Sequence, residues 1–517
     1  MKRLYIIIFY GALFFSSCSD YQKNIHVVSL PDAVELISES KRIGTELLLP
    51  TKIFIKEDKL IIFEPLSKGM FKVFDFPSLK YLYSYGDNGR GPNEFISVSS
   101  DDIIENSAEF VEIFDVNKLD FVVFSDSSAR IISQTPISLL HLKNPINRLK
   151  KINDSIYYFD NLFEEDNKNE FTRLNVRSGD RTYFSAYPDW AKNIKSPMDK
   201  FQTYSKFSRS NSFDNKMVVF YYSFPVIKFL DLDGNIMKEI HVDTQQSIIR
   251  EPSNDNIFYF LEYPVFTDEF IYVFWVEKSK NDIMNHSENF KPEILVFDWD
   301  GNVAGRYKLD QPITSFTLSE ETGKIYCTPF PGENVINIIY VYDLPKIKNE
   351  KMSLARIENS LYSLNILDGY DFSQGSKQDG VDKIIEKNGL KTNVNYFVQV
   401  RDKNGFAQHD LESIQIRVCS PVGETQKDWP NFLINTRTNW ENIKRRKIII
   451  DGLNVVQTTF YINSLNPKNE VEQLYVNSYF FEKNNVFIEI TIYSKRDNFS
   501  SYHPAFKNMI RSFELKD

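Results

Sequence analysis

The stretch Gly86-Asp87-Asn88-Gly89-Arg90-Gly91-Pro92-Asn93-Glu94-Phe95 decides the fold. It follows an aromatic, strand-like run and carries three glycines and a proline, which fix a tight backbone path. No helix start follows it, so it is not expected to hold phosphate. We expect a joint between two β segments. Arg90 and Glu94 are interpreted as an ion pair that pins the joint; the alternative is a charged lip that contacts a ligand.

A repeat of about fifty residues surrounds this joint. From about Lys52 to Asp343 the chain is a succession of short strand-like runs, and a pair that usually is apolar recurs before a polar turn-former. The instances are Val73-Phe74-Asp75, Val123-Phe124-Ser125, Arg173-Leu174-Asn175, Phe229-Leu230-Asp231, Val296-Phe297-Asp298 and Val341-Tyr342-Asp343. Six units of about four strands each predict a six-bladed β-propeller. The stretch from Gly86 to Phe95 would then join the first blade to the second.

The sixth unit lacks one strand, because Leu344-Pro345-Lys346 breaks the pattern. We expect Ile25-His26-Val27-Val28-Ser29-Leu30 to supply it and to close the ring, since closure removes an exposed sheet edge. The spacing of Val34, Leu36 and Ile37 favours one helical turn between that strand and the first blade.

Two Asp-x-Asp-Gly-Asn segments, Asp231 to Asn235 and Asp298 to Asn302, are nearly superposable. Asp-Gly and Gly-Asn favour tight turns, so each is predicted to join two strands as a hairpin. A calcium loop is the alternative, but the glycine comes too early for the EF-hand pattern and its closing glutamate is absent. No cofactor is expected, with calcium as the remaining possibility.

The first 17 residues read as a signal peptide. Lys2 and Arg3 precede an apolar run from Leu4 to Phe15 that is too short for a membrane span. Phe15-Ser16-Ser17-Cys18 resembles the lipobox of bacterial lipoproteins, which implies a lipid on Cys18 and, with Ser19 following, the outer membrane. The leaflet stays open. An ordinary secretory signal is the alternative.

The glycine joint and the repeat together resemble the TolB-like, six-bladed propeller lipoproteins of Bacteroidota, which share such a joint with NHL-repeat propellers. The resemblance covers about residues 24–345. It implies a lipid-anchored propeller whose function is largely unassigned. The sequence thus predicts a mainly β chain: signal peptide 1–17, propeller 18–345 and a smaller α+β sandwich domain 346–517.

The C-terminal domain reads as hairpins with helices. Strand runs occur at Tyr396–Arg401, 447–450, 455–461, 474–481 and 486–493, and helical spacing at Val381–Lys387 and between Tyr502 and Ile510. Hairpins covered by a closing helix predict an α+β sandwich. Its ending resembles PsbP/Mog1-like domains, which implies partner binding.

Composition narrows the function. The chain without its signal has 59 basic and 70 acidic residues, a net charge of −11, so nucleic-acid binding is not expected. Cys327 and Cys419, in different domains, are expected to be small buried residues. No metalloprotease, serine-hydrolase, Walker or Cys-x-x-Cys motif occurs, and the six histidines are scattered.

Three functions remain. The first is a lipid-anchored scaffold that binds a protein or glycan partner, without enzymatic activity. The second is a metal-dependent hydrolase or lyase acting at the propeller channel. The third is a structural role in an envelope complex. Besides Arg90 and Glu94, Trp190 is the candidate binding residue because it falls in a loop; Trp275 and Trp299 are expected to pack in the core.

Overall fold

The computed structural model describes most of residues 25–345, and beyond them residue 347 and the strands of a second unit. The segments outside this description in the first range are 106–109, 138–145, 147, 162–167, 188–193, 195, 197–198, 201–202, 212–215, 245–256, 268, 286–290 and 331–336. The chain divides into two compact units, Met1–Pro345 and Lys346–Asp517. Each is described by itself.

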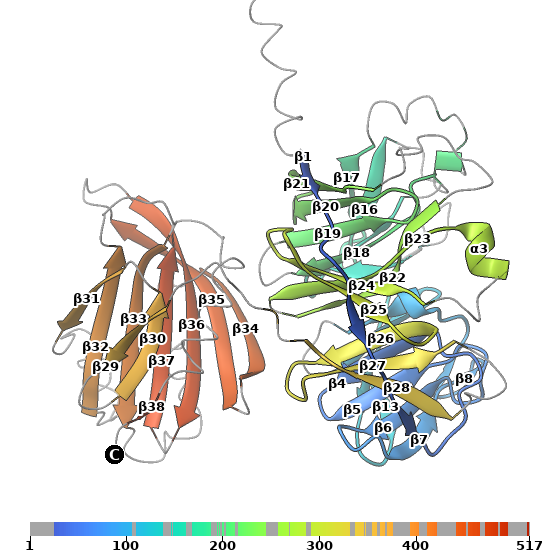
Figure 1. Ribbon diagram of the computed structural model, residues 1–517, viewed down its shortest axis with the longest axis horizontal. Helices are drawn as coiled ribbons and strands as arrows, with labels where there is room; N and C mark the ends of the chain where they lie inside the picture. Colours follow the sequence, from blue (N-terminus) through green and yellow to red (C-terminus); the bar gives the residue numbers. More distant parts are fainter. Residues whose placement is uncertain are drawn as a thin grey trace, which may run out of the picture. The chain divides into compact units, whose positions relative to one another are not determined.

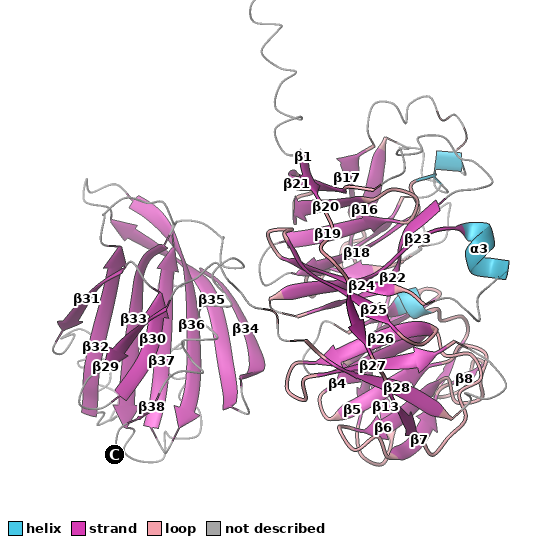
Figure 2. Cartoon of the chain, in the orientation of Figure 1, coloured by secondary structure: helices cyan, strands magenta, loops and turns pink. Residues whose placement is uncertain are grey.

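The first unit is a six-bladed propeller, built from six small antiparallel sheets that follow one another along the chain (Figure 1). The first blade contains β4 (Lys52–Lys56), β5 (Lys59–Phe63), β6 (Phe71–Asp75) and β7 (Tyr81–Tyr85), and the second contains β10 (Ile103–Ile104), β11 (Val111–Asp115), β12 (Lys118–Phe124) and β13 (Ala129–Pro136). The third blade contains β14 (Lys150–Lys151), β15 (Ile156–Asp160), β16 (Asn169–Asn175) and β17 (Arg181–Ala186), and the fourth contains β18 (Lys206–Asn211), β19 (Lys216–Tyr221), β20 (Val226–Asp231) and β21 (Ile236–Val242). The fifth blade contains β22 (Ile257–Phe266), β23 (Phe270–Ser279), β24 (Glu293–Asp298) and β25 (Val303–Leu309), and the sixth contains β26 (Ile313–Ser319), β27 (Lys324–Pro329) and β28 (Ile338–Asp343). Helices are few and short in the described residues, among them α3 (Lys280–Asn285), as Figure 2 shows.

The recurring apolar pair marks the same strand in every blade. All six instances fall on the third strand: β6, β12, β16, β20, β24 and β28. The predicted six-bladed architecture is therefore confirmed, and the repeat is a true structural unit.

Both faces of each blade are buried, and the alternation of side chains along a strand shows why. On β5, Leu60 and Ile62 pack in the cluster shared with the sixth blade, whereas Ile61 and Phe63 pack in the cluster shared with the second. Because successive side chains point to opposite faces, a continuous apolar strand feeds two cores at once. The core of the propeller is therefore a set of inter-blade clusters.

The ring is closed by a different N-terminal strand from the one predicted. β3 (Glu39–Arg42) pairs antiparallel with β28 and is the fourth strand of the sixth blade. The predicted closing segment contains β1 (Ile25–Val28), which instead lies parallel to β21 on the outside of the fourth blade. The expected helical turn is also wrong: β2 (Val34–Leu36) lies parallel to β25 on the fifth blade. The N-terminal segment thus runs across three blades.

The two Asp-Gly-Asn segments are hairpin turns, as predicted. They join β20 to β21 and β24 to β25, with Gly234 and Gly301 at φ of 92° and 76°. In the second turn, Oδ1 of Asp298 accepts hydrogen bonds from the backbone N–H groups of Asp300 and Asn302, at 3.0 and 2.8 Å. The aspartate side chain is thus committed to holding the turn.

The second unit is described as strands only. A three-stranded sheet contains β29 (Leu354–Glu358), β30 (Tyr362–Leu367) and β38 (Glu514–Leu515). A seven-stranded sheet has the order β31 (Tyr370–Gly375), β32 (Asn393–Asp402), β33 (Leu411–Ser420), β37 (Val486–Ser494), β36 (Val471–Lys483), β35 (Leu453–Leu465) and β34 (Glu441–Ile450). The expected hairpins are therefore present at β34–β35 and β36–β37. Both expected helices, Val381–Lys387 and Tyr502–Ile510, lie outside the described residues.

Candidate functional site

The glycine joint connects β7 to β10 and is built around the side chain of Glu94. Its short strands β8 (Asp87–Asn88) and β9 (Glu94–Phe95) pair with each other, and the backbone N–H of Gly91 donates to Oε2 of Glu94 at 2.6 Å. A Cβ on Gly89 would lie 1.9 Å from that oxygen. Gly89 and Gly91 are therefore required because the carboxylate occupies the space that a side chain would fill, whereas a Cβ on Gly86 would lie 2.8 Å from the ring of Phe95. The joint predicted from the sequence is confirmed.

The expected ion pair between Arg90 and Glu94 is not formed, although both residues are described. Glu94 bonds the backbone of its own loop instead. Arg90 is exposed and lines one side of a groove of about 730 Å³. The remaining lining is Gly91, Pro92, Asn93, Glu94, Lys118, Ile131, Ile132, Ser133 and Gln134. Since β13 is the outer strand of the second blade, this groove lies at the periphery of the propeller and not at the channel.

A second, smaller cavity of about 80 Å³ lies in the central channel. Residues on or directly beside the first strand of all six blades line it, which identifies it as the channel. Its charged residues are Lys52, Asp101, Glu105, Lys150, Lys151 and Arg209, and its aromatic residues are Phe207, Phe266 and Phe316. Four cationic groups therefore face two carboxylates.

Each of these two carboxylates interacts with more than one cation. Oε1 of Glu105 lies 2.5 Å from Nζ of Lys52, and Glu105 also interacts electrostatically with Arg209. Asp101 accepts a hydrogen bond from Nε of Arg148 at 3.1 Å. Its second carboxylate oxygen lies 3.9 Å from Nζ of Lys150.

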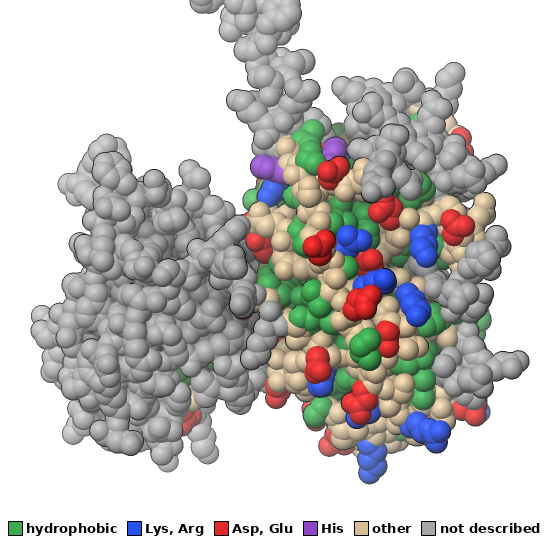
Figure 3. Space-filling view, viewed as in Figure 1, with side chains coloured by type: hydrophobic (Ala, Val, Ile, Leu, Met, Phe, Trp, Pro, Cys, Tyr) green, Lys and Arg blue, Asp and Glu red, His purple; other side chains and the backbone are tan. Residues whose placement is uncertain are grey.

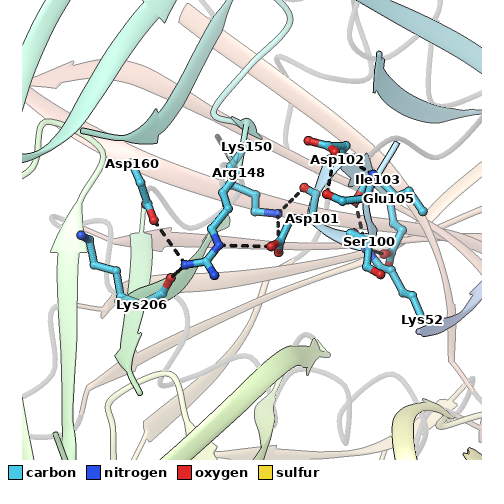
Figure 4. Close-up of polar contacts among 11 residues, drawn as sticks. Lys52, Ser100, Asp101, Asp102, Ile103, Glu105, Arg148, Lys150, Asp160 and Lys206 are labelled. Atoms are coloured by element: carbon cyan, nitrogen blue, oxygen red, sulfur yellow. Dashed lines mark hydrogen bonds and ion pairs between the residues drawn. The ribbon is translucent and has the colours of Figure 1, made fainter. Parts of the chain in front are cut away.

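Figure 4 shows how the network continues toward the fourth blade. There Nη1 of Arg148 lies 3.5 Å from a carboxylate oxygen of Asp160 and donates to the backbone carbonyl of Lys206. Lys206 is buried and belongs to β18. Arg148 thus connects the second, third and fourth blades around the channel.

Burial sets the proton affinities of this network. Burial lowers the pKa of Lys150 and of Arg209, because the charged forms lose their water. Burial likewise lowers the pKa of Lys56, at the end of β4, to about 8. Burial raises the pKa of the Asp160 carboxyl, because here the charged form is the deprotonated one. Burial would also raise the pKa of Glu105, but Lys52 and Arg209 more than offset it, so that this pKa is lowered.

The channel donor set does not fit a divalent metal. Ca²⁺ and Mg²⁺ need several oxygen ligands, and here two carboxylates already balance several cations. Among the residues that the structure describes, no three His, Cys, Asp or Glu side chains gather closely enough to hold a metal ion. The described channel residues therefore do not support the metal-dependent hydrolase alternative.

Other sequence expectations have mixed outcomes. Trp275 and Trp299 are buried, 2 % and 3 % exposed, in the core between the fourth and fifth blades, as predicted. Cys327 is a buried free thiol, also as predicted. Cys18 and Trp190 lie outside the described residues, so their roles stay predictions. No helix among the described residues is long and apolar enough to cross a membrane.

The charged channel residues were missed by sequence reasoning. The feature of the sequence that could have indicated them is a basic residue within the short first strand of a blade. Examples are Lys52, which precedes Ile53-Phe54, and Arg209, which follows Phe207 and Ser208. Such a lysine also fits a solvent-facing position, and only the six-fold arrangement of first strands brings these cations together.

The face of the propeller that Figure 3 shows carries acidic and basic side chains interspersed with apolar ones. No single charge dominates it, in contrast with the channel. Among the described residues, the channel and the peripheral groove are two hollows with defined lining residues.

Comparison with known proteins places this architecture. No curated protein sequence matches the chain. Three similar solved structures are a putative exported protein of Bacteroides fragilis (12 % identity, 63 % of this chain and 100 % of that one, TM-score 0.42), a DUF4221-family member of Bacteroides vulgatus (14 %, 61 % and 98 %, TM-score 0.44), and PsbP of the cyanobacterium Synechocystis (13 %, 34 % and 99 %, TM-score 0.21).

The family model described as TolB-like 6-blade propeller-like matches residues 38–321, which is more than half of the chain. The match begins at the segment that contributes the ring-closing strand β3 and ends at the sixth blade. The chain therefore belongs to the TolB-like 6-blade propeller family.

Proposed function

We propose that this chain is a non-enzymatic binding protein of the bacterial cell envelope, held at the outer membrane by a lipid on Cys18. Its propeller would present a rigid surface to a protein or glycan partner. The observation that carries this proposal is the groove of about 730 Å³ between the glycine joint and β13. One wall is fixed by the hydrogen bonds of Glu94, so the groove is pre-formed.

The other wall is an outer strand with an available edge. In the described sheet, β13 pairs on one side only, with β12, and Ile132 on it is 47 % exposed. This propeller already accepts extended segments on such edges, because β1 pairs with β21 and β2 with β25. An extended segment of a protein partner would add to β13 in the same way, with Arg90 beside it.

A photo-crosslinking amino acid at position 132 tests this in intact cells. We expect adducts of defined mass at position 132 and none at position 237, since Met237 is similarly exposed but lies on β21 of the fourth blade, outside the residues that line the groove. The Arg90→Glu variant should reduce the adduct. Absence of an adduct at 132, or equal adducts at both positions, contradicts the protein form of the proposal; binding to an envelope polysaccharide with no adduct would identify a glycan instead.

The anchor is tested separately. We expect wild-type protein to incorporate labelled palmitate and to fractionate with the outer membrane, and Cys18→Ser to do neither. The Cys327→Ser variant is the matched control, because that thiol is buried in the propeller. Release of wild-type protein into the soluble envelope fraction would show an ordinary secretory signal.

A further inference from the structure

The central channel concentrates positive charge inside an acidic protein. The chain has a formal net charge of −9, yet the channel cavity is lined by four cationic side chains and two carboxylates. Burying a charge is costly unless an opposite charge accompanies it. An arrangement with more cations than carboxylates in a cavity is therefore an environment that favours an added anion.

Both carboxylates that line the cavity are shared between cations, so the cavity lining has more cations than carboxylates. Glu105 acts on both Lys52 and Arg209, and Asp101 acts on both Arg148 and Lys150. Asp102 also acts on Lys150 and Asp160 lies near Arg148, but neither of these carboxylates lines the cavity. Lys151, the fourth lining cation, is different: its Nζ lies 2.5 Å from Glu112, a carboxylate behind the lining. Among the groups that line the cavity, Lys52, Lys150 and Arg209 are therefore the cations that share a carboxylate of the lining with another cation.

The cavity walls suit a compact anion. The guanidinium of Arg209 lies 4.8 Å from the ring centre of Phe266, which holds it against an apolar wall. Apolar surroundings strengthen charge interactions, and a guanidinium presents donors in a planar fork that matches carboxylate or phosphate oxygens. The volume of about 80 Å³ exceeds several-fold the ~10–15 Å³ that one water requires.

We propose that the propeller channel binds a small oxyanion, carrying a carboxylate or phosphate group, between Arg209, Lys150 and Lys52. This site is independent of the partner groove, because that groove is lined by the joint and by β12 and β13, on the periphery. Burial lowers the pKa of both Lys150 and Arg209, and a bound anion would raise each again by stabilising the charged form.

Calorimetric titration of the full chain tests the site. The probes are inorganic phosphate, acetate and succinate, with acetamide as the neutral analogue and ionic strength fixed with sodium chloride. We expect at least one anion to bind and acetamide not to bind. Tighter binding of phosphate would identify a phosphate ligand, and tighter binding of acetate or succinate a carboxylate. No binding of any anion at matched ionic strength would overturn the proposal.

The variant arm compares two arginines. Arg209→Met should weaken anion binding by about tenfold or more, because a charge-assisted contact is lost. Arg130→Met should leave it unchanged, since Arg130 is exposed on β13. Equal loss in both variants would contradict the site.

A measurement on the wild-type protein guards against misfolding of Arg209→Met. The bound anion should slow acetylation of Lys150 by acetic anhydride several-fold, as read by mass spectrometry. Lys308, whose side chain is 54 % exposed, should react at an unchanged rate. Unchanged acetylation of Lys150 in the presence of a binding anion would place that anion elsewhere and refute the assignment.

Discussion

Replacing Gly301 by alanine tests how tightly the fourth and fifth blades pack. Gly301 lies in the turn between β24 and β25 at a φ of 76°, and an added Cβ would lie 2.1 Å from Cδ1 of Ile240 and 3.0 Å from Cε2 of Phe229. Both neighbours are buried side chains of the fourth blade. The left-handed backbone costs a non-glycine residue about 1–2 kcal/mol, and displacing packed side chains costs a further ~1–3 kcal/mol.

The matched control is Gly179→Ala. Gly179 has a φ of 80°, but nothing lies within 4 Å of an added Cβ. It should therefore lose only the backbone part, about 1–2 kcal/mol. The difference between the two variants, about 1–3 kcal/mol, measures the inter-blade contact alone.

Urea unfolding followed by tryptophan fluorescence is the assay, because Trp275 and Trp299 belong to the same core cluster as Ile240. Adding Ile240→Val removes the clashing Cδ1 atom, so the double variant should be more stable than the sum of the single effects predicts. If Gly301→Ala and Gly179→Ala unfold alike, or if the double variant is strictly additive, the inter-blade packing argument fails.

Three further predictions follow from buried charges and from the joint. Lys56→Met should raise the free energy of unfolding at pH 7 by up to about 3 kcal/mol, because burial lowers the pKa of Lys56 in the folded state from the ordinary 10.5 to about 8. The wild type gains stability as the pH rises from about 8 to 10.5, so the advantage of the variant should shrink across that window in pH-dependent unfolding. Glu170→Gln should lower the free energy of unfolding by about 3–5 kcal/mol, because the fully buried Glu170 carboxylate lies 2.8 Å from Nζ of Lys228 and 3.6 Å from Nζ of Lys206, both of which are buried. The control in urea unfolding is Glu321→Gln, because Glu321 is exposed. Equal stabilities of the two variants would contradict the prediction. Gly89→Ala should lower the melting temperature because its Cβ would lie 1.9 Å from Oε2 of Glu94. When the same substitution is made in the Glu94→Ala variant, calorimetry should show most of that loss of stability removed. An equal loss of stability in the Glu94→Ala variant would refute the steric explanation.

The propeller could be predicted from the sequence because apolar residues recur at the same place in each repeat. The third strand of each blade is buried on both faces, so its apolar pair recurs visibly. In the joint, Gly89 and Gly91 leave room for the side chain of Glu94, and Gly86 leaves room for the ring of Phe95. The closing strand could not be found that way. Glu39-Ser40-Lys41-Arg42 has no apolar residue, whereas the segment chosen instead contains Val27, which is 69 % exposed. Outer strands face solvent, and β3 is joined to β28 through backbone pairing that leaves no apolar signature.

The candidate sites were less predictable for a related reason. Arg90 and Glu94 were recognised from glycine-rich local sequence, but whether Glu94 bonds an arginine or its own backbone depends on the path of the loop. The channel network depends on contacts between blades. Arg148 reaches Asp101 and Asp160, which come from different units of the repeat, so no local pattern reports the pairing.

The closing strand also sets the order of events during synthesis. β3 pairs with β28, so residues 39–42 must wait for residues 338–341 to emerge from the ribosome before the sixth blade is complete. Contacts so distant in sequence form late, because a long loop must close first. Until then the first blade lacks one of its two neighbours, and the ring stays open. A chain shortened before residue 338 would therefore lack the strand that pairs with β3, and its ring would stay open.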